Sequence, residues 1–171
     1  LGDRATAIRE SPHDEPNEYS FDTCAGPSLS GSDLARCMEL LEEGDAVSVD
    51  AARRDLPQSP SIVLARKAKE IVGLGANKGP RPWYANKVSA SSNWPLDEGT
   101  PELGYVVVSK DHQGKHLSSA IVTALLRASP GALFATTDKP RMMAVLAKAG
   151  FTRKGEAWQG KTGSLSLWLR D

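Results

Sequence analysis

The sequence predicts an α/β (α+β) fold, because runs with strand composition alternate with runs of helical periodicity along most of the chain. Residues 105–108 form a β-branched and aromatic run, which is typical of a buried strand. The apolar residues that follow recur at the three- and four-residue spacings of an amphipathic helix: Leu117, Ile121, Val122, Ala124 and Leu125. Residues 151–154 and 165–169 also have strand composition, and the Gly-Lys-Thr-Gly turn between them predicts a hairpin.

Composition excludes several classes of protein. The 171 residues suit one domain that can bury a core, and their net charge of zero gives no reason to expect nucleic acid or an acidic membrane as partner. No apolar run approaches the length of a membrane span. Cys24 and Cys37 lack metal-site spacing, so we expect two free thiols in a reducing compartment, the cytoplasm, and no bound metal.

The first 29 residues are rich in Asp, Glu, Ser and Pro, and they allow two interpretations. They form a loosely ordered arm, or Tyr19, Ser20 and Phe21 add an edge strand. We therefore divide the chain into an N-terminal arm, 1–29, and a folded domain, 30–171.

Two helices are expected next. Residues 30–44 carry one apolar stripe, Ser30 or Ser32 can cap the first turn, and Asp33 supplies a capping-box carboxylate. Cys37 lies on the stripe, which indicates a small apolar filler rather than a reactive thiol. A shorter helix is expected over 51–56, ending before Pro57.

Residues 62–65 and 71–74 predict a pair of strands joined by a polar turn over 66–70. The glycines that follow do not form a nucleotide-binding loop, because no GK[ST] ending and no helix come after them. Gly73 and Gly75 are instead expected to mark a twisted or bulged strand.

Residues 81–101 are expected to form a long connection that contains Trp83 and Tyr84. These aromatic residues either cover the core or line a binding pocket. Residues 132–137 predict another strand, and Pro140 predicts the first turn of a helix with Asp138 as a possible cap and Gly150 at its end.

The polar turn at 109–113 joins a strand to a helix, and such a helix start offers free backbone N–H groups to an anion. Residues 113–118 resemble the Arg/Gln-x-x-Gly-x-Gly/Ala loop of the GNAT (GCN5-related) N-acetyltransferases, with His116 and Ser118 at the two glycine positions. Residues 147–151 resemble the Gly-Phe ending of that family's last helix, and 133–137 resemble the strand that splays from 106–108.

This resemblance implies a mixed, mostly antiparallel sheet with helices on both faces and acetyl-CoA as cosubstrate. It places the cofactor against the strand backbone and the turn: Val106, Val107, Val108, Gln113, Gly114, Lys115, His116, Leu117 and Ser118. Lys115 and Arg141 could add positive charge beside phosphate. Trp83 and Tyr84 become candidate residues of the acceptor pocket.

The resemblance also assigns Glu102, eleven residues before Gln113, as the base that accepts the amine proton. A solvated strand-edge carboxylate, with water taking the proton, remains the alternative. The family's general-acid tyrosine is replaced by Leu146, which leaves Tyr84, Tyr105 and Ser109 as substitutes.

Two functions are therefore carried forward. The first is an N-acetyltransferase that acts on the amine of a small molecule or peptide, and Glu102 favours it. The second is a non-catalytic acyl-CoA-binding or partner-docking module, and His116, Ser118 and Leu146 favour it. The length of the acyl group and the choice between monomer and homodimer stay open.

Overall fold

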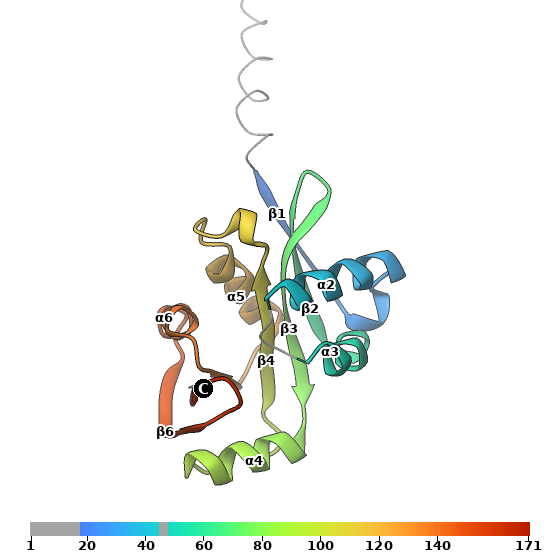
Figure 1. The fold of residues 1–171 in the computed structure, drawn as a ribbon. Coiled ribbons are helices and arrows are strands. Elements are labelled where there is room, and N and C mark those ends of the chain that lie inside the picture. Colours follow the sequence, from blue (N-terminus) through green and yellow to red (C-terminus); the bar gives the residue numbers. More distant parts are fainter. Residues whose placement is uncertain (1–17, 45–47) are drawn as a thin grey trace, which may run out of the picture.

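The computed structural model describes residues 18–44 and 48–171, which form a seven-stranded sheet in the order β1-β2-β3-β4-β5-β7-β6 (Figure 1). The strands are β1 (Tyr19–Cys24), β2 (Ser61–Lys67), β3 (Glu70–Pro80), β4 (Pro101–Val108), β5 (Leu133–Thr137), β6 (Thr152–Gln159) and β7 (Ser164–Arg170). The α-helices are α2 (Gly31–Gly44), α3 (Val49–Asp55), α4 (Pro82–Ser92), α5 (Leu117–Ala128) and α6 (Pro140–Lys148). Short 3-10 turns are η1 (Gly26–Ser28), η2 (Leu56–Gln58) and η3 (Lys110–His112).

The sheet is mixed and mostly antiparallel, as predicted. β1 to β4 pair in antiparallel order, and β7 pairs antiparallel with both β5 and β6. β4 and β5 are the parallel pair among the described strands, and they join the two antiparallel halves of the sheet.

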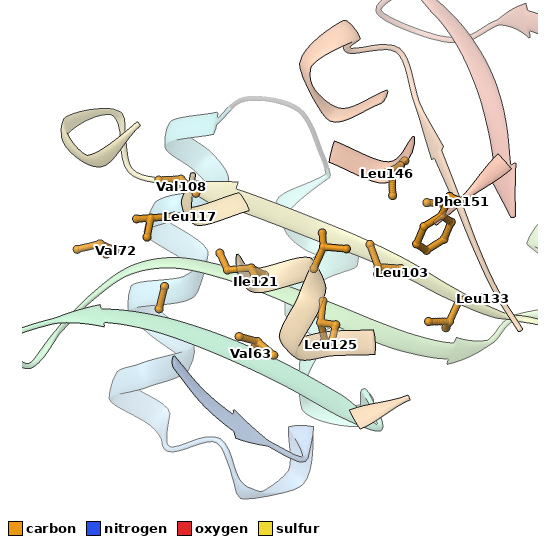
Figure 2. Close-up of a cluster of buried hydrophobic side chains, with 13 residues drawn as sticks. Val63, Val72, Leu103, Val108, Leu117, Ile121, Leu125, Leu133, Leu146 and Phe151 are labelled. Atoms are coloured by element: carbon orange, nitrogen blue, oxygen red, sulfur yellow. The ribbon is translucent and has the colours of Figure 1, made fainter. Parts of the chain in front are cut away.

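Helices cover both faces of the sheet, which confirms the predicted layers. Figure 1 shows α5 on one side of β4, with α2 and α3 on the other. The core beneath α5 includes Val63, Leu103, Ile121 and Leu125 and extends to Leu146 and Phe151 (Figure 2). Burying aliphatic side chains of this size stabilises the fold by about 1.5–3 kcal/mol each.

The first helix has the expected cap, but the carboxylate of Asp33 makes a different contact from the one that the sequence predicted. The Asp33 backbone N–H donates to Ser30 Oγ at 3.1 Å, so Ser30 caps α2 as predicted. The Asp33 carboxylate accepts from Arg66 instead, at 3.2 Å, because a cation on the neighbouring strand competes for it. Cys37 is fully buried on the α2 stripe, which agrees with its expected role as apolar filler.

The edge strand, which was one of two interpretations of the N-terminal sequence, is present. β1 pairs with β2 from Tyr19, opposite Lys67, to Cys24, opposite Ile62. Tyr19 also places its hydroxyl 2.9 Å from His112 Nδ1 in η3, so the edge of the sheet contacts the turn after β4. Residues 1–17 of the expected arm lie outside the described residues.

The prediction of a loop over 81–101 was wrong for half of that segment, because Pro82–Ser92 forms α4. Pro82 occupies the first turn, where its missing N–H costs nothing, and Asn93 ends the helix in the left-handed region with φ of 59°. Few apolar residues mark the buried side, mainly Ala85 and Val88, so the periodicity was too weak to detect. The expected cap Asp138 was also wrong, since Lys139 precedes α6 and makes no side-chain cap.

The glycines of β3 allow α5 to approach the sheet closely. The pairing of β3 with β2 shifts register between Ala65 and Arg66, where β3 contains one residue more than β2, so β3 is bulged beside Gly73 as expected. A Cβ atom on Gly75 would lie 2.6 Å from Ile121 Cγ2, closer than packed atoms allow. The close packing of α5 on β3 therefore depends on glycine at this position.

Candidate functional site

A large cleft opens where β4 and β5 separate. The two strands pair only at Glu102 and Phe134, after which β5 leaves β4. The open cleft has a volume of about 1930 Å³ and extends from the start of α5 to α4. β4 residues 103–108 line it, so strand backbone that would pair in a continuous sheet faces the cleft instead.

A bulge at Tyr105 bends β4 beside the separation. Gly104 lies opposite Ala76, whereas Val107 lies opposite Leu74, so β4 contains one residue more than β3 between these pairs. Tyr105 has φ of 56°, a left-handed conformation that is strained for an aromatic residue. Such strain is common at functional sites, where the surrounding structure holds it in place.

The turn between β4 and α5 has the backbone geometry of an anion site. Gly114 and His116 have φ of 81° and 61°, so His116 adopts the conformation that glycine takes most easily. From Gln113 onward in the described chain, the first backbone N–H group that donates a backbone hydrogen bond is that of Ala120. It donates to His116 O at 3.2 Å. Within the part of the chain that the structure describes, the N–H groups of 113–119 therefore make no backbone hydrogen bond, and they lie at the positive end of the helix dipole.

The predicted cofactor residues come together along this cleft with one exception. Its lining includes Val106, Val107, Val108, Gln113, Gly114, His116, Leu117 and Ser118. Lys115 is exposed and lies outside that lining, so its side chain does not form part of the cleft wall. Arg141 lines the cleft from the first turn of α6.

Glu102 is buried at the opposite end of the cleft, between two cations. Its side chain is 6% exposed, with Lys78 Nζ 3.3 Å from Oε2 and Arg81 Nη2 2.5 Å from Oε1. Each carboxylate oxygen is thus held by a charged donor. Glu102 is neither solvated nor isolated, which removes the expectation of a merely solvated carboxylate.

Asp55 and Tyr105 complete this buried polar cluster. Asp55 Oδ2 accepts the Tyr105 hydroxyl at 2.8 Å and lies 3.4 Å from Arg81 Nη1. Burial and the hydrogen bond to Asp55 raise the pKa of Tyr105. Desolvation lowers the pKa of Lys78, against the attraction of Glu102. Arg81 Nε is buried without a hydrogen-bond partner in the described chain, so a ligand oxygen could satisfy it.

The aromatic residues proposed for the acceptor pocket lie on α4 and line the cleft. The Tyr84 hydroxyl is 3.0 Å from Thr136 Oγ1, so α4 contacts β5 beside the cleft. Trp83 is 64% exposed, and the Arg81 guanidinium lies 5.4 Å from its ring centroid. Tyr84 therefore belongs to the wall of the cleft, and Trp83 stands at its mouth.

Leu146 is fully buried beside Phe151, so no hydroxyl stands at this position of α6. Of the three suggested substitutes, Tyr84 and Tyr105 line the cleft and Ser109 does not.

Sequence reasoning missed the two cations that contact Glu102, Lys78 and Arg81, and it missed Asp55, which contacts Arg81. They lie on different elements or beyond the strand pairs that could be assigned from sequence. One signal was available: antiparallel pairing of 71–74 with 105–108, extended backwards, brings Lys78 close to Glu102.

The described residues contain no group of three or more His, Cys, Asp or Glu side chains placed to hold a metal ion. In the same part of the chain, none of the helices has both the length and the apolar character needed to cross a membrane.

Comparison with known proteins agrees with this architecture. The acetyltransferase (GNAT) family model matches residues 32–151. Escherichia coli ElaA is similar in structure, with a TM-score of 0.64 and 14% identity over 90% of this chain and 100% of that one. A GNAT-family acetyltransferase from Streptococcus agalactiae has a TM-score of 0.68 and 12% identity over 88% of this chain and 94% of its own.

YncA of Salmonella typhimurium, solved with its cofactor acetyl-CoA, has a TM-score of 0.64 and 14% identity over 89% of this chain and 92% of its own. No curated protein sequence matches the chain significantly. At these identities the solved structures establish the fold, and the family model establishes the family.

Proposed function

Because the chain belongs to the GNAT acetyltransferase family, we propose that it transfers an acetyl group from acetyl-CoA to a primary amine. The observation that carries this proposal is the separation of β4 from β5, which opens strand backbone to the cleft that ends at the first N–H groups of α5. The acetyl-CoA bound to the similar Salmonella typhimurium protein supports the choice of cosubstrate.

In this proposal the pyrophosphate binds the backbone N–H groups of 113–118, with Arg141 as an additional positive charge. The pantetheine arm pairs with the open side of β4 at Val106, Val107 and Val108, as an added strand would. The N–H groups on that side can also stabilise the oxyanion that forms when an amine attacks the thioester.

The amine enters beside Glu102, Trp83 and Tyr84. Glu102 accepts its proton, directly or through a water molecule, and the two cations hold the carboxylate in place. With Leu146 buried in the core, the departing thiolate takes its proton from solvent or from Tyr84. The acceptor is a small molecule or a peptide, and the place of action is the cytoplasm.

A thiol-release assay with acetyl-CoA and a panel of amines, peptides and aminoglycosides tests the activity. Calorimetric titration with CoA tests binding separately. We expect heat on CoA addition and thiol release with at least one amine. Absence of both heat and a thermal shift at millimolar CoA would overturn the proposal.

The second candidate is a non-catalytic acyl-CoA-binding module, and the buried Leu146 favours it, because the chain lacks a hydroxyl where the family has its general acid. The same two assays separate the candidates. Binding of CoA without thiol release from any amine favours the binding module.

A further inference from the structure

Lys78 is a primary amine inside the cleft proposed to hold acetyl-CoA. Its side chain is only 10% exposed and lines the cleft beside Glu102. The other cleft lysines are exposed to water: Lys87, Lys110, Lys139 and Lys161. Lys78 therefore differs from them in both burial and its carboxylate partner.

The path of the side chain depends on Gly104. A Cβ atom at Gly104 would lie 2.6 Å from Lys78 Cε and 3.0 Å from Nζ, so any larger residue would push the lysine away. The lysine thus lies flat across β4, and its ammonium stands 4.1 Å from the centroid of the Tyr105 ring. Nζ therefore lies beside Glu102, Gly104 and the ring of Tyr105, all of which line the cleft.

We propose that the protein acetylates its own Lys78 with the acetyl-CoA bound in the cleft. The inference rests on the proposed function, because the same cofactor supplies the acetyl group. The Lys78 amine attacks the thioester carbonyl carbon, so a C–N bond forms and the C–S bond breaks. The nitrogen gives its proton to Glu102, which passes the proton to solvent. CoA leaves as a thiolate, which then takes up a proton.

The surroundings of Lys78 favour this step. Glu102 Oε2 is 3.3 Å from Nζ, within reach of the proton that must leave. Burial and the nearby Arg81 cation lower the pKa of Lys78, which increases the fraction of neutral, nucleophilic amine. Acetylation removes the positive charge, so the contact with Glu102 ceases to be an ion pair and Arg81 remains its charged partner.

The purified full chain is incubated with acetyl-CoA that carries an isotopically labelled acetyl group, then digested with trypsin. Acetylation blocks cleavage after Lys78, and the bond between Arg81 and Pro82 resists trypsin, so the product is a peptide of residues 70–87. We expect this peptide to gain one acetyl group at Lys78. Its rate constant should not depend on protein concentration, because the reaction is intramolecular, and excess CoA should slow it.

Two variants serve as controls. Lys78→Arg keeps the charge and should gain no label in the peptide that contains it, and circular dichroism checks its folding. Lys69→Arg removes an exposed lysine outside the cleft and should leave labelling of Lys78 unchanged. Wild-type chain unfolded in urea should also lose the selectivity for Lys78, which keeps the test independent of the variants.

Three results would overturn the inference. They are an unlabelled Lys78 in a chain that calorimetry shows to bind acetyl-CoA, labelling of Lys69 as fast as Lys78, and a rate constant that rises with protein concentration. Thiol release with free amines, measured on the same preparation, reports separately on the proposed function. A chain that acetylates free amines but not Lys78 refutes this inference alone, whereas a chain that does not bind acetyl-CoA refutes both.

Discussion

The Tyr105 hydroxyl donates a hydrogen bond of 2.8 Å to Asp55 Oδ2, which connects the bulge of β4 to the last residue of α3. The same carboxylate oxygen lies 3.4 Å from Arg81, which also holds Glu102. The strained residue of the bulge is therefore fixed by the cluster that surrounds the proposed base. Changes on α3 can reach Glu102 through this contact and Arg81.

Replacing Tyr105 with Phe should lower the free energy of unfolding by about 1.5–3 kcal/mol, because the lost hydrogen bond has a charged acceptor. Tyr84→Phe is a matched control, since it loses a hydroxyl contact with the neutral Thr136 and should cost about 0.5–1.5 kcal/mol. Urea denaturation followed by circular dichroism measures both. Equal losses in the two variants would contradict the importance of Asp55.

Replacing Gly114 with Pro should weaken CoA binding by about tenfold or more, which corresponds to about 1.4 kcal/mol. Proline cannot adopt φ of 81° and removes an N–H donor from the anion site. Gly131→Pro introduces a similar conflict at φ of 99°, at a position outside the cleft lining. Calorimetry should show weakened binding for Gly114→Pro only. Unchanged affinity would mean that the phosphates bind elsewhere.

Replacing Glu102 with Gln should reduce turnover by about a hundredfold near neutral pH, with little change in CoA affinity, if this side chain accepts the amine proton. The variant should also unfold more easily, because two buried cations lose a charged partner. The assay is therefore run where circular dichroism shows a folded chain. The exposed Glu98→Gln is the control and should keep normal turnover. Loss of CoA binding instead would indicate that Glu102 holds β4 in place.

Because Lys78 is buried, the free energy of unfolding should change with pH in the alkaline range. Its pKa is lowered in the folded state, so between that value and 10.5 the unfolded chain binds more protons than the folded chain. Wild-type stability should therefore rise with pH in this window, relative to the Lys78→Met variant. Lys78→Arg, which stays charged, should show no such rise. Urea denaturation from about pH 7 to about pH 10 measures the differences, and parallel curves would contradict a lowered pKa.

Cys37 should resist alkylation while the chain is folded. Burial raises the pKa of its thiol to about 12, so near pH 8 only about one molecule in ten thousand carries the reactive thiolate. Iodoacetamide should modify the half-buried Cys24 first, and both thiols only after unfolding in urea. Mass spectrometry follows the two sites. Fast labelling of Cys37 in the folded chain would contradict its burial on α2.

The sequence predicted the elements that have strong local patterns. The strand–turn–helix around residues 105–126, the helix capped by Ser30 and the terminal hairpin are all present. Each depends on periodicity, capping or turn chemistry between residues that are close in the chain. Helix α4 was missed because its buried side contains few apolar residues, of which Ala85 and Val88 are the main two.

The candidate site was predicted along its backbone and at a few side chains, among them Glu102 and Tyr84, but without the contacts that hold Glu102. The turn at 113–118 could be located because phosphate-binding backbone has a local signature in glycine and helix start. The partners of Glu102 could not be predicted, because Lys78 lies on β3 and Arg81 immediately precedes α4. Asp55, at the end of α3, contacts Arg81 rather than Glu102. Contacts between distant segments depend on tertiary packing, which local patterns do not encode.

The early separation of β5 from β4 has a consequence for hydrogen–deuterium exchange. Central strands normally protect their amides on both sides, but beyond Glu102 the amides of β4 that point toward β5 have no strand partner among the described residues. Alternate amides of this central strand should therefore exchange as fast as those of an exposed edge. A ligand that pairs with them would slow their exchange, so deuterium uptake at 106–108 reports occupancy of the cleft without any need for turnover.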